Sequence, residues 1–230
     1  MRLLLLLAAA ATFGGCARAS RPSAAPGPAT PPVNTADLPV ASDDVADRLL
    51  VDVTRADSTI LVEMRYATAN NFTGNPLPGY RANRALLRRE AAYALARVQR
   101  RLEPEGLTLK LFDAYRPVRA TDAMVEWAQR TGREDLLRDG YIASRSRHNL
   151  GLAVDLTLAD RTTEAELDMG TPFDTFSPSA HTANATGQAA RNRQRLKTAM
   201  EAEGFTNYDR EWWHYSYSLP NPVRFDRVIR

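Results

Sequence analysis

The sequence is poor in cysteine, lysine and long apolar runs, three features that often mark the class of a protein. Cys16 is the only cysteine among 230 residues, so the chain cannot form an internal disulfide. Lysine occurs only at Lys110 and Lys197, and the arginines are scattered among Asp and Glu, with a net charge of +3. No basic run is interleaved with aromatic residues, which argues against nucleic-acid binding. The apolar run at residues 3–13 is too short for a permanent membrane helix.

That N-terminal run has the pattern of a secretory signal. Arg2 precedes it, and the small residues Gly14 and Gly15 follow it, immediately before Cys16. A cysteine at the end of such a segment is typical of a covalent lipid anchor, and residues 1–16 resemble a bacterial lipoprotein signal. We therefore expect export with lipidation at Cys16. The alternative is ordinary secretion with Cys16 removed.

Residues 17–42 are rich in Pro, Ala, Ser, Thr and Gly. A segment of this composition cannot bury enough apolar surface to order itself, and it is typical of a tether. We expect it to hold a folded body clear of a membrane. Residues 43–230 have the size of one domain with one core, and they contain no sequence repeat and no second linker.

Hydrophobic periodicity predicts both helices and strands in this domain. We expect helices over residues 83–102, 120–129 and 187–203, with Asn83 as the N-cap of the first, and strands within 49–64 and over 108–114, 152–158 and 212–218. Residues 66–80 form a long loop with several aromatic and amide side chains. Loops of that length inside a compact domain are commonly functional, although a well-packed surface loop has the same composition.

Two short motifs, far apart in the chain, carry the chemistry. His148 precedes a strand in which Asp155 alternates with Val154 and Leu156. Because neighbouring strand residues point to opposite faces, Asp155 can face a cavity while Val154 and Leu156 face the core. Near the C-terminus, Glu211–His214 adds a second imidazole and a second carboxylate. Either motif alone arises often by chance, but two of the three histidines of the chain lie in these motifs.

Two imidazoles and a carboxylate form a ligand set for a catalytic zinc, which typically keeps three protein ligands and one open position. His148, Asp155 and His214 supply the three ligands, and Glu211 is left to take a proton from water. Residues three apart point to opposite faces of a regular strand. We therefore expect Glu211 to lie in the bend that enters the last strand. The predicted reaction is hydrolysis of an amide bond.

An arginine at the end of a predicted strand completes this set. Arg116 precedes Pro117, which biases its backbone toward an extended conformation, so that the side chain projects from the end of the strand. A fixed cation at this place would stabilise a tetrahedral oxyanion. The third histidine, His181, is expected in a hydrogen-bonded structural role rather than as a metal ligand.

These motifs resemble, in the same order, those of the zinc D-alanyl-D-alanine dipeptidases, a family that includes enzymes of vancomycin resistance. The matching residues run from about Leu49 to the C-terminus and include Tyr66-Ala67-Thr68, Asn71-Phe72-Thr73-Gly74, Asp113-x-Tyr115-Arg116-Pro117, Ser146-x-His148-x2-Gly151-x-Ala153-x-Asp155 and Glu211-Trp212-Trp213-His214. The resemblance implies a single α+β domain with a central antiparallel sheet that carries one zinc ion, flanked by helices. It implies His148, Asp155 and His214 as ligands, Glu211 as general base and Arg116 as transition-state stabiliser. We expect Asp113 to orient Arg116 rather than to take part in the chemistry.

The same resemblance implies a small closed substrate pocket. Tyr66, Tyr80, Ser146 and Asp174 would line it, with Asp174 facing the free amine of a dipeptide. A buried carboxylate that pairs with an ammonium rejects a peptide whose amine is acylated, because the carboxylate would be left unpaired. We therefore expect a lipid-anchored zinc dipeptidase of the periplasm or cell envelope. It would hydrolyse D-Ala-D-Ala in peptidoglycan turnover or dipeptide salvage, without nucleic acid or a protein partner.

Two other functions fit the same motifs. A D,D-carboxypeptidase that trims peptidoglycan stem peptides would need an open groove in place of the pocket around Asp174. A non-catalytic, zinc-dependent wall-binding module would keep the ligands without a working base, whereas this chain has Glu211 and Arg116. The predicted ligand set also accepts other divalent ions in vitro.

Overall fold

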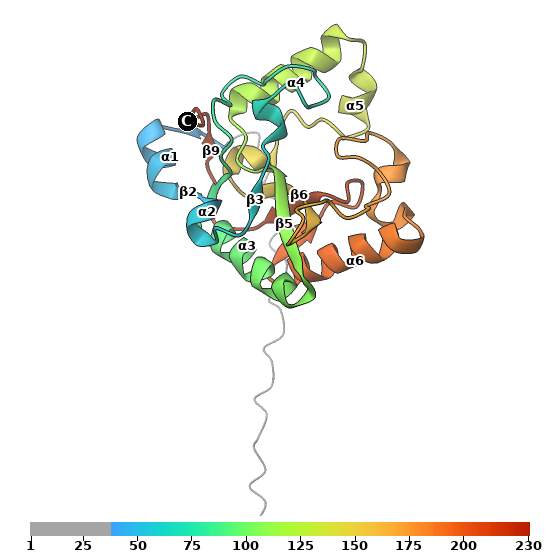
Figure 1. Ribbon diagram of the computed structural model, residues 1–230. Coiled ribbons are helices and arrows are strands. Elements are labelled where there is room, and N and C mark those ends of the chain that lie inside the picture. Colours follow the sequence, from blue (N-terminus) through green and yellow to red (C-terminus); the bar gives the residue numbers. More distant parts are fainter. Residues whose placement is uncertain (1–37) are drawn as a thin grey trace, which may run out of the picture. The chain divides into compact units, whose positions relative to one another are not determined.

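Strand β6, Ala153–Asp160, is buried along nearly all of its length. It is the middle strand of a five-stranded sheet with the order β3-β5-β6-β8-β7. Figure 1 shows the computed structural model, with β3, β5 and β6 side by side. Its run of Ala, Val and Leu is typical of a strand covered on both faces. The structure describes residues 38–230. The predicted signal, the lipidation site Cys16 and most of the predicted tether lie outside the described residues.

The central sheet is mixed rather than wholly antiparallel. Antiparallel pairs join β6 to β5 (Leu107–Asp113) and to β8 (His214–Tyr217), and β7 (Phe205–Asn207) continues this pattern beyond β8. At the other edge, β3 (Leu61–Val62) pairs with β5 in parallel, which corrects the prediction for that edge. A parallel pair needs a long crossover connection, and here the chain from β3 to β5 passes through helix α3 (Arg89–Leu102).

Two small sheets complete the strand pairing. Strand β2 (Leu50–Asp52) pairs with β4 (Leu86–Arg88) antiparallel, and β1 (Val40–Ala41) pairs with β9 (Arg224–Phe225) in parallel. The folded body therefore begins before the predicted boundary at residue 43. Its first residues are held by backbone pairing with the far end of the chain, which local composition does not reveal.

Helix α3 begins at Arg89 and not after Asn83, because residues 86–88 pair with β2 first. The Asn83 side chain accepts a hydrogen bond from the backbone N–H of Met64 at 2.8 Å and donates one to the carbonyl of Val62 at 2.9 Å. Asn83 thus fixes the end of β3 instead of capping a helix.

The other helices of the described residues are α1 (Asp43–Leu49), α2 (Val53–Ala56), α4 (Val118–Arg130), α5 (Glu134–Arg138) and α6 (Gly187–Glu201). Helices α3 and α6 contact each other and the sheet, and Figure 1 shows them side by side. Their buried residues, such as Leu95 and Leu196, join those of the sheet in one apolar core. A second core surrounds α4 and α5. None of the helices in residues 38–230 has the length and apolar character of a membrane span.

Candidate active site

A 3-10 helix positions the first imidazole. Helix Arg147–Leu150 begins after Ser146, whose hydroxyl accepts a hydrogen bond from the backbone N–H of His148 at 3.2 Å. The helix ends at Gly151, where φ is +63°. A Cβ at this glycine would lie 3.2 Å from the backbone nitrogen of Arg88 as well as 2.6 Å from Leu50 Cδ2, so a larger residue would strain the turn that aims His148.

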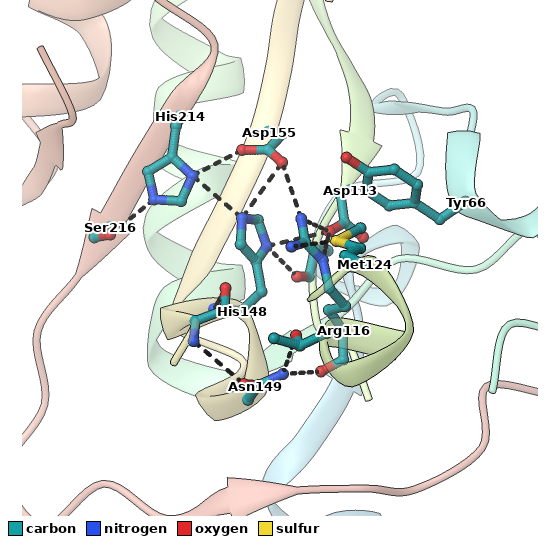
Figure 2. A network of polar contacts seen from close by, with 12 residues as sticks. Tyr66, Asp113, Arg116, Met124, His148, Asn149, Asp155, His214 and Ser216 are labelled. Atoms are coloured by element: carbon teal, nitrogen blue, oxygen red, sulfur yellow. Dashed lines mark hydrogen bonds and ion pairs between the residues drawn. The ribbon is translucent and has the colours of Figure 1, made fainter. Parts of the chain in front are cut away.

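The main chain also sets which nitrogen of His148 is free. Nδ1 lies 2.6 Å from the carbonyl oxygen of Ala114, and only an N–H can bond to a carbonyl. Nδ1 therefore carries a proton, which leaves Nε2 as the nitrogen that can bind a metal ion. Figure 2 shows Nε2 facing both Asp155 and His214.

Strand register brings these two partners together. Asp155 on β6 lies directly opposite His214 on β8. The distance from Asp155 Oδ1 to His214 Nδ1 is 2.9 Å, and that from Asp155 Oδ2 to His148 Nε2 is 3.3 Å. The two imidazole nitrogens lie 3.2 Å apart. The ligand atoms of two motifs far apart in sequence thus meet at one point.

This group fits a zinc ion. In the described part of the chain it is the only set of three His, Cys, Asp or Glu side chains whose ligand atoms all lie within 4.8 Å of one another. Donors on a tetrahedral zinc at about 2.0–2.1 Å are separated by roughly 3.3 Å, close to the separations found here. Without a metal ion, the facing nitrogens of His148 and His214 and the carboxylate of Asp155 would share a single proton. A metal cation can instead accept one lone pair from each of the three groups.

The protonation of the group also suits a metal. Burial alone would raise the pKa of Asp155, but the neighbouring imidazoles, His148 above all, hold it below its usual range. Burial lowers the pKa of His214, although Asp155 acts in the opposite direction. At neutral pH the carboxylate is therefore charged and His214 is neutral, as metal ligands need to be. The hydroxyl of Ser216 lies 3.3 Å from His214 Nε2 and orients the ring from behind.

Glu211 lies in the turn that enters β8, as the spacing predicts. The backbone N–H of His214 donates to the carbonyl of Glu211 at 3.2 Å, and Glu211 Oε2 lies 4.0 Å from His214 Nδ1. Strand β8 begins at His214, so the predicted start at Trp212 is wrong, because both tryptophans belong to this turn. Burial, and then the charges of Asp155 and Asp174, raise the pKa of Glu211 well above its usual range.

Arg116 reaches the same site from beyond the end of β5. Its Nε and Nη2 bond to Asp113 Oδ2 at 2.9 Å and 2.8 Å, and Nη2 lies 3.6 Å from Asp155 Oδ2. Its guanidinium carbon lies 4.9 Å from the centre of the Tyr66 ring, and Nη1 contacts Met124 Sδ at 3.2 Å (Figure 2). Burial opposes the charge, but Asp113 and the groups around it raise the pKa of Arg116. The guanidinium is therefore a fixed cation.

Tyr80, predicted to line the pocket, does not line this cavity. Its hydroxyl donates to Asp113 Oδ1 at 2.5 Å, and the other oxygen of this carboxylate binds Arg116. Sequence resemblance indicated that the residue belongs to the site but not which way its side chain points. Asp113 orients Arg116, as the sequence predicted, and the hydroxyl of Tyr80 is the part of this support that the sequence did not reveal.

The side chains described so far surround a cavity of about 290 Å³. Of the predicted site residues, those that line it are Tyr66, Arg116, Ser146, His148, Asp155, Asp174, Glu211 and His214. The sequence did not predict Met124, Tyr141, Arg145, Phe176, Tyr208 or Trp213, which line it as well. Most of these come from loops, where no periodicity shows which side chains point inward.

Asp174 faces this cavity from an unusual backbone conformation. Its φ is +60°, a region that residues other than glycine rarely adopt. The hydroxyl of Tyr66 lies 3.1 Å from each of its carboxylate oxygens. Burial, and then the charge of Asp155, raise the pKa of Asp174 well above its usual range. A cation from outside the protein would stabilise the ionised form of this carboxylate.

The third histidine has a structural role, as predicted. His181 Nε2 lies 3.2 Å from the hydroxyl of Tyr141, and the two rings pack 6.4 Å apart. His181 does not belong to the ligand group of His148, Asp155 and His214.

Comparison with known proteins adds an independent observation. The family model of peptidase M15, described as D-Ala-D-Ala dipeptidase, matches residues 47–224. The D-alanyl-D-alanine dipeptidase of Streptomyces coelicolor is 41% identical over 174 residues, which cover 69% of this chain and 86% of that protein. The enzyme of the same name from Enterococcus faecium is 38% identical over 168 residues, covering 66% and 83%.

The comparison with solved structures also finds a similar chain. It is the vancomycin resistance D,D-dipeptidase VanXYg in complex with a D-Ala-D-Ala phosphinate analog. The two chains are 20% identical, the match covers 74% of this chain and 66% of that one, and the TM-score is 0.40.

Proposed function

The chain belongs to the M15 family of D-Ala-D-Ala dipeptidases, which are metallopeptidases, and from this premise we propose that it hydrolyses D-Ala-D-Ala to two molecules of D-Ala. One observation carries the proposal. A single cavity of about 290 Å³ is lined by the ligand group, by Glu211 and Arg116, and by the buried carboxylate of Asp174. These are the groups that amide hydrolysis and recognition of a free amine require.

We propose that His148, Asp155 and His214 hold a zinc ion. When bound, the ion supplies positive charge that polarises a peptide carbonyl and makes nearby water more acidic. Glu211 accepts a proton from the attacking water and returns it to the leaving amine. Its place supports this role, because Glu211 Oε2 lies 4.0 Å from the ligand nitrogen of His214, and a zinc ion there would favour the ionised carboxylate that accepts a proton.

Arg116 stabilises the oxyanion that forms during attack. Preorganised donors act best when they need not move during the reaction, and Asp113 holds Nε and Nη2 of this guanidinium. Tyr80 in turn fixes Asp113 from behind. The three side chains act as one positioned cation.

Asp174 selects the substrate by its charge. A dipeptide with a free amine brings an ammonium to this carboxylate, and Tyr66 holds the carboxylate in place. An acylated amine would leave Asp174 buried without a partner, which costs binding free energy. The proposal therefore favours a dipeptidase over a D,D-carboxypeptidase that acts on longer stem peptides.

Amine release by the zinc-loaded protein tests the proposal, with D-Ala-D-Ala and its N-acetylated form as substrates. We expect cleavage of the free dipeptide and little of the acetylated one. Preference for the acetylated form would indicate a carboxypeptidase. No cleavage of either, with one zinc bound per chain, would favour a binding module.

We also propose that the protein is exported and lipid-anchored, on the strength of the signal-like residues 1–16 alone. Metabolic labelling with palmitate should mark the parent protein but not a Cys16→Ala variant, and the parent should fractionate with membranes. An unlabelled parent protein in the soluble fraction would contradict the anchor.

A further inference from the structure

A buried arginine outside the cavity holds both ends of the loop that carries Asp174. Arg193 lies on α6 and is only 1% exposed. Its Nε donates to the carbonyl of Met169 at 2.7 Å. Its Nη1 donates to the carbonyls of His181 at 2.7 Å and Ser179 at 3.2 Å, and Nη2 donates to Ser179 at 3.1 Å. One side chain thus binds three carbonyls, before and after Asp174.

This arginine has no ion-pair partner within the part of the chain that the structure describes. Carbonyl oxygens stabilise its positive charge, and so does the Trp212 ring, whose centre lies 5.9 Å from the guanidinium carbon. Burial lowers the pKa of Arg193, although Asp168 acts in the opposite direction. A buried cation without a carboxylate is costly. Its presence indicates that the three carbonyls need a donor of this shape.

The centre of the loop is held by side chains, since the Tyr66 hydroxyl lies beside the Asp174 carboxylate and the indole N–H of Trp212 donates to Thr171 Oγ1 at 2.9 Å, whereas backbone structure contributes little. Residues 168–181 contain no α-helix and no strand of the sheets, only the 3-10 turn Pro178–Ala180. Asp174 lies near the middle of the loop, and its φ of +60° is unfavourable for a residue with a side chain. Such a conformation persists only where the surroundings enforce it. The Phe173 ring packs against the rings of Phe112, Trp213 and Tyr66, with centroids 4.9, 5.4 and 6.1 Å away, and the Arg193 bonds close the loop at both ends.

We propose that Arg193 is a positioning residue for substrate selection. By binding the carbonyls of Met169, Ser179 and His181, it holds Asp174 at the place where the ammonium of a dipeptide binds. Arg193 also lies over the ring of Trp212, but the turn that carries Glu211 keeps its own bond to the loop, from the indole N–H of Trp212 to Thr171 Oγ1. The inference rests on the proposed dipeptidase function, and Arg193 itself does not line the cavity.

The shape of the side chain matters as much as its charge. A guanidinium presents five N–H groups in one plane, so it can bind carbonyls that approach from different directions. A lysine ammonium is a point charge on a flexible stem and cannot bind all three carbonyls in this arrangement. Arg193→Lys therefore keeps the positive charge and removes the planar arrangement of five N–H groups.

Steady-state kinetics of Arg193→Lys test the inference. We expect KM for D-Ala-D-Ala to rise about tenfold while kcat changes by less than about threefold, since the ligand group and Glu211 stay in place. The preference for the free over the N-acetylated dipeptide should fall by a similar factor. Leu196→Ala is the matched control, because Leu196 is fully buried on the same helix and makes no hydrogen bond to the loop. It should lower thermal stability and leave KM and the preference unchanged.

Hydrogen exchange gives a second readout that does not depend on activity. Backbone amides of residues 168–181 should exchange faster in Arg193→Lys, with zinc content equal to that of the parent. If the lysine variant does not accumulate, Asn192→Ala removes a single tie to the same loop, from Asn192 Nδ2 to the carbonyl of Asp168 at 2.8 Å. Asn192→Ala should also raise KM, by a smaller factor than Arg193→Lys.

The outcomes separate the two proposals. If the parent protein releases no amine from D-Ala-D-Ala, the proposed function fails. If the parent is active and the lysine variant keeps the parental KM and preference, only the role of Arg193 fails, even when exchange of the loop increases. That last result would make Arg193 a purely structural residue.

Discussion

The cavity has two halves that are built in different ways. The metal half is centred on the sheet, where strand register places Asp155 opposite His214, and the segments next to these strands add His148 and Glu211. The selective half lies on loops, where no backbone ladder exists and side chains bind the main chain instead. Asn71 ties one loop to itself, and Arg193 ties the loop of Asp174 to α6. The comparison suggests that the sheet sets the chemistry and the loops set the choice of substrate.

If this division holds, changes in the metal half should lower turnover for every substrate. Glu211→Gln keeps the shape of the side chain and removes the proton acceptor. We expect kcat to fall by about 10²–10⁴-fold with bound zinc unchanged, measured by amine release and metal analysis. A variant with one zinc per chain and the parental rate would show that Glu211 is not the base.

Arg116→Lys should have the next largest effect. Lysine cannot keep both bonds to Asp113 and still present a donor to the oxyanion, so we expect kcat to fall about a hundredfold. Arg119→Lys is the matched control, because Arg119 pairs with Asp226 at the surface, 2.7 Å away. Equal losses in the two variants would argue against a special role for Arg116.

Tyr80→Phe tests the support behind that cation. It removes the hydroxyl that donates to Asp113 and leaves the ring in place. We expect kcat to fall by about tenfold or less, with KM nearly constant, because the support acts through Arg116. Tyr93→Phe should have no effect, since Tyr93 is 49% exposed on α3. A change in KM alone would place Tyr80 in the selective half after all.

The smallest effect is expected far from both halves. Burial opposes the ionisation of Asp52, but Thr54 and Arg84 hold its pKa below the usual value of 3.8. A depressed pKa stabilises the fold above the unfolded pKa, and this stabilisation is lost as pH falls through the folded pKa. Asp52→Asn should therefore cost about 1 kcal/mol or less at pH 7. The difference from the parent should shrink below about pH 4 in urea denaturation, with kcat and KM unchanged at pH 7.

The metal half could be predicted from sequence because its residues lie in short motifs. His148 and Asp155 are seven positions apart on a turn and its strand, and the alternation of that strand determines which residue faces the cavity. The position of Glu211 in a turn followed from the same geometry. The edge strand β3 has only two residues, so no periodicity could show that it pairs in parallel.

The selective half was predicted less well for a physical reason. The partners of Arg193 are the backbone carbonyls of residues 169 and 181, which folding brings close to it. Every residue has a backbone carbonyl, so the sequence does not show which ones an arginine will bind. A single arginine in a helix resembles any surface arginine. The direction of Tyr80 depends on Asp113, a contact between residues 33 positions apart. Loop side chains of this kind are oriented by tertiary contacts and not by local periodicity.

The division between the halves is tested most directly by Asp174→Asn, which keeps the size of the side chain and removes its charge. The quantity to measure is the ratio of kcat/KM for D-Ala-D-Ala to that for N-acetyl-D-Ala-D-Ala, compared with the same ratio in Glu211→Gln. We predict that the ratio collapses in Asp174→Asn and is preserved in Glu211→Gln, although the second variant is far slower. A ratio that stays at the parental value in Asp174→Asn would contradict the account.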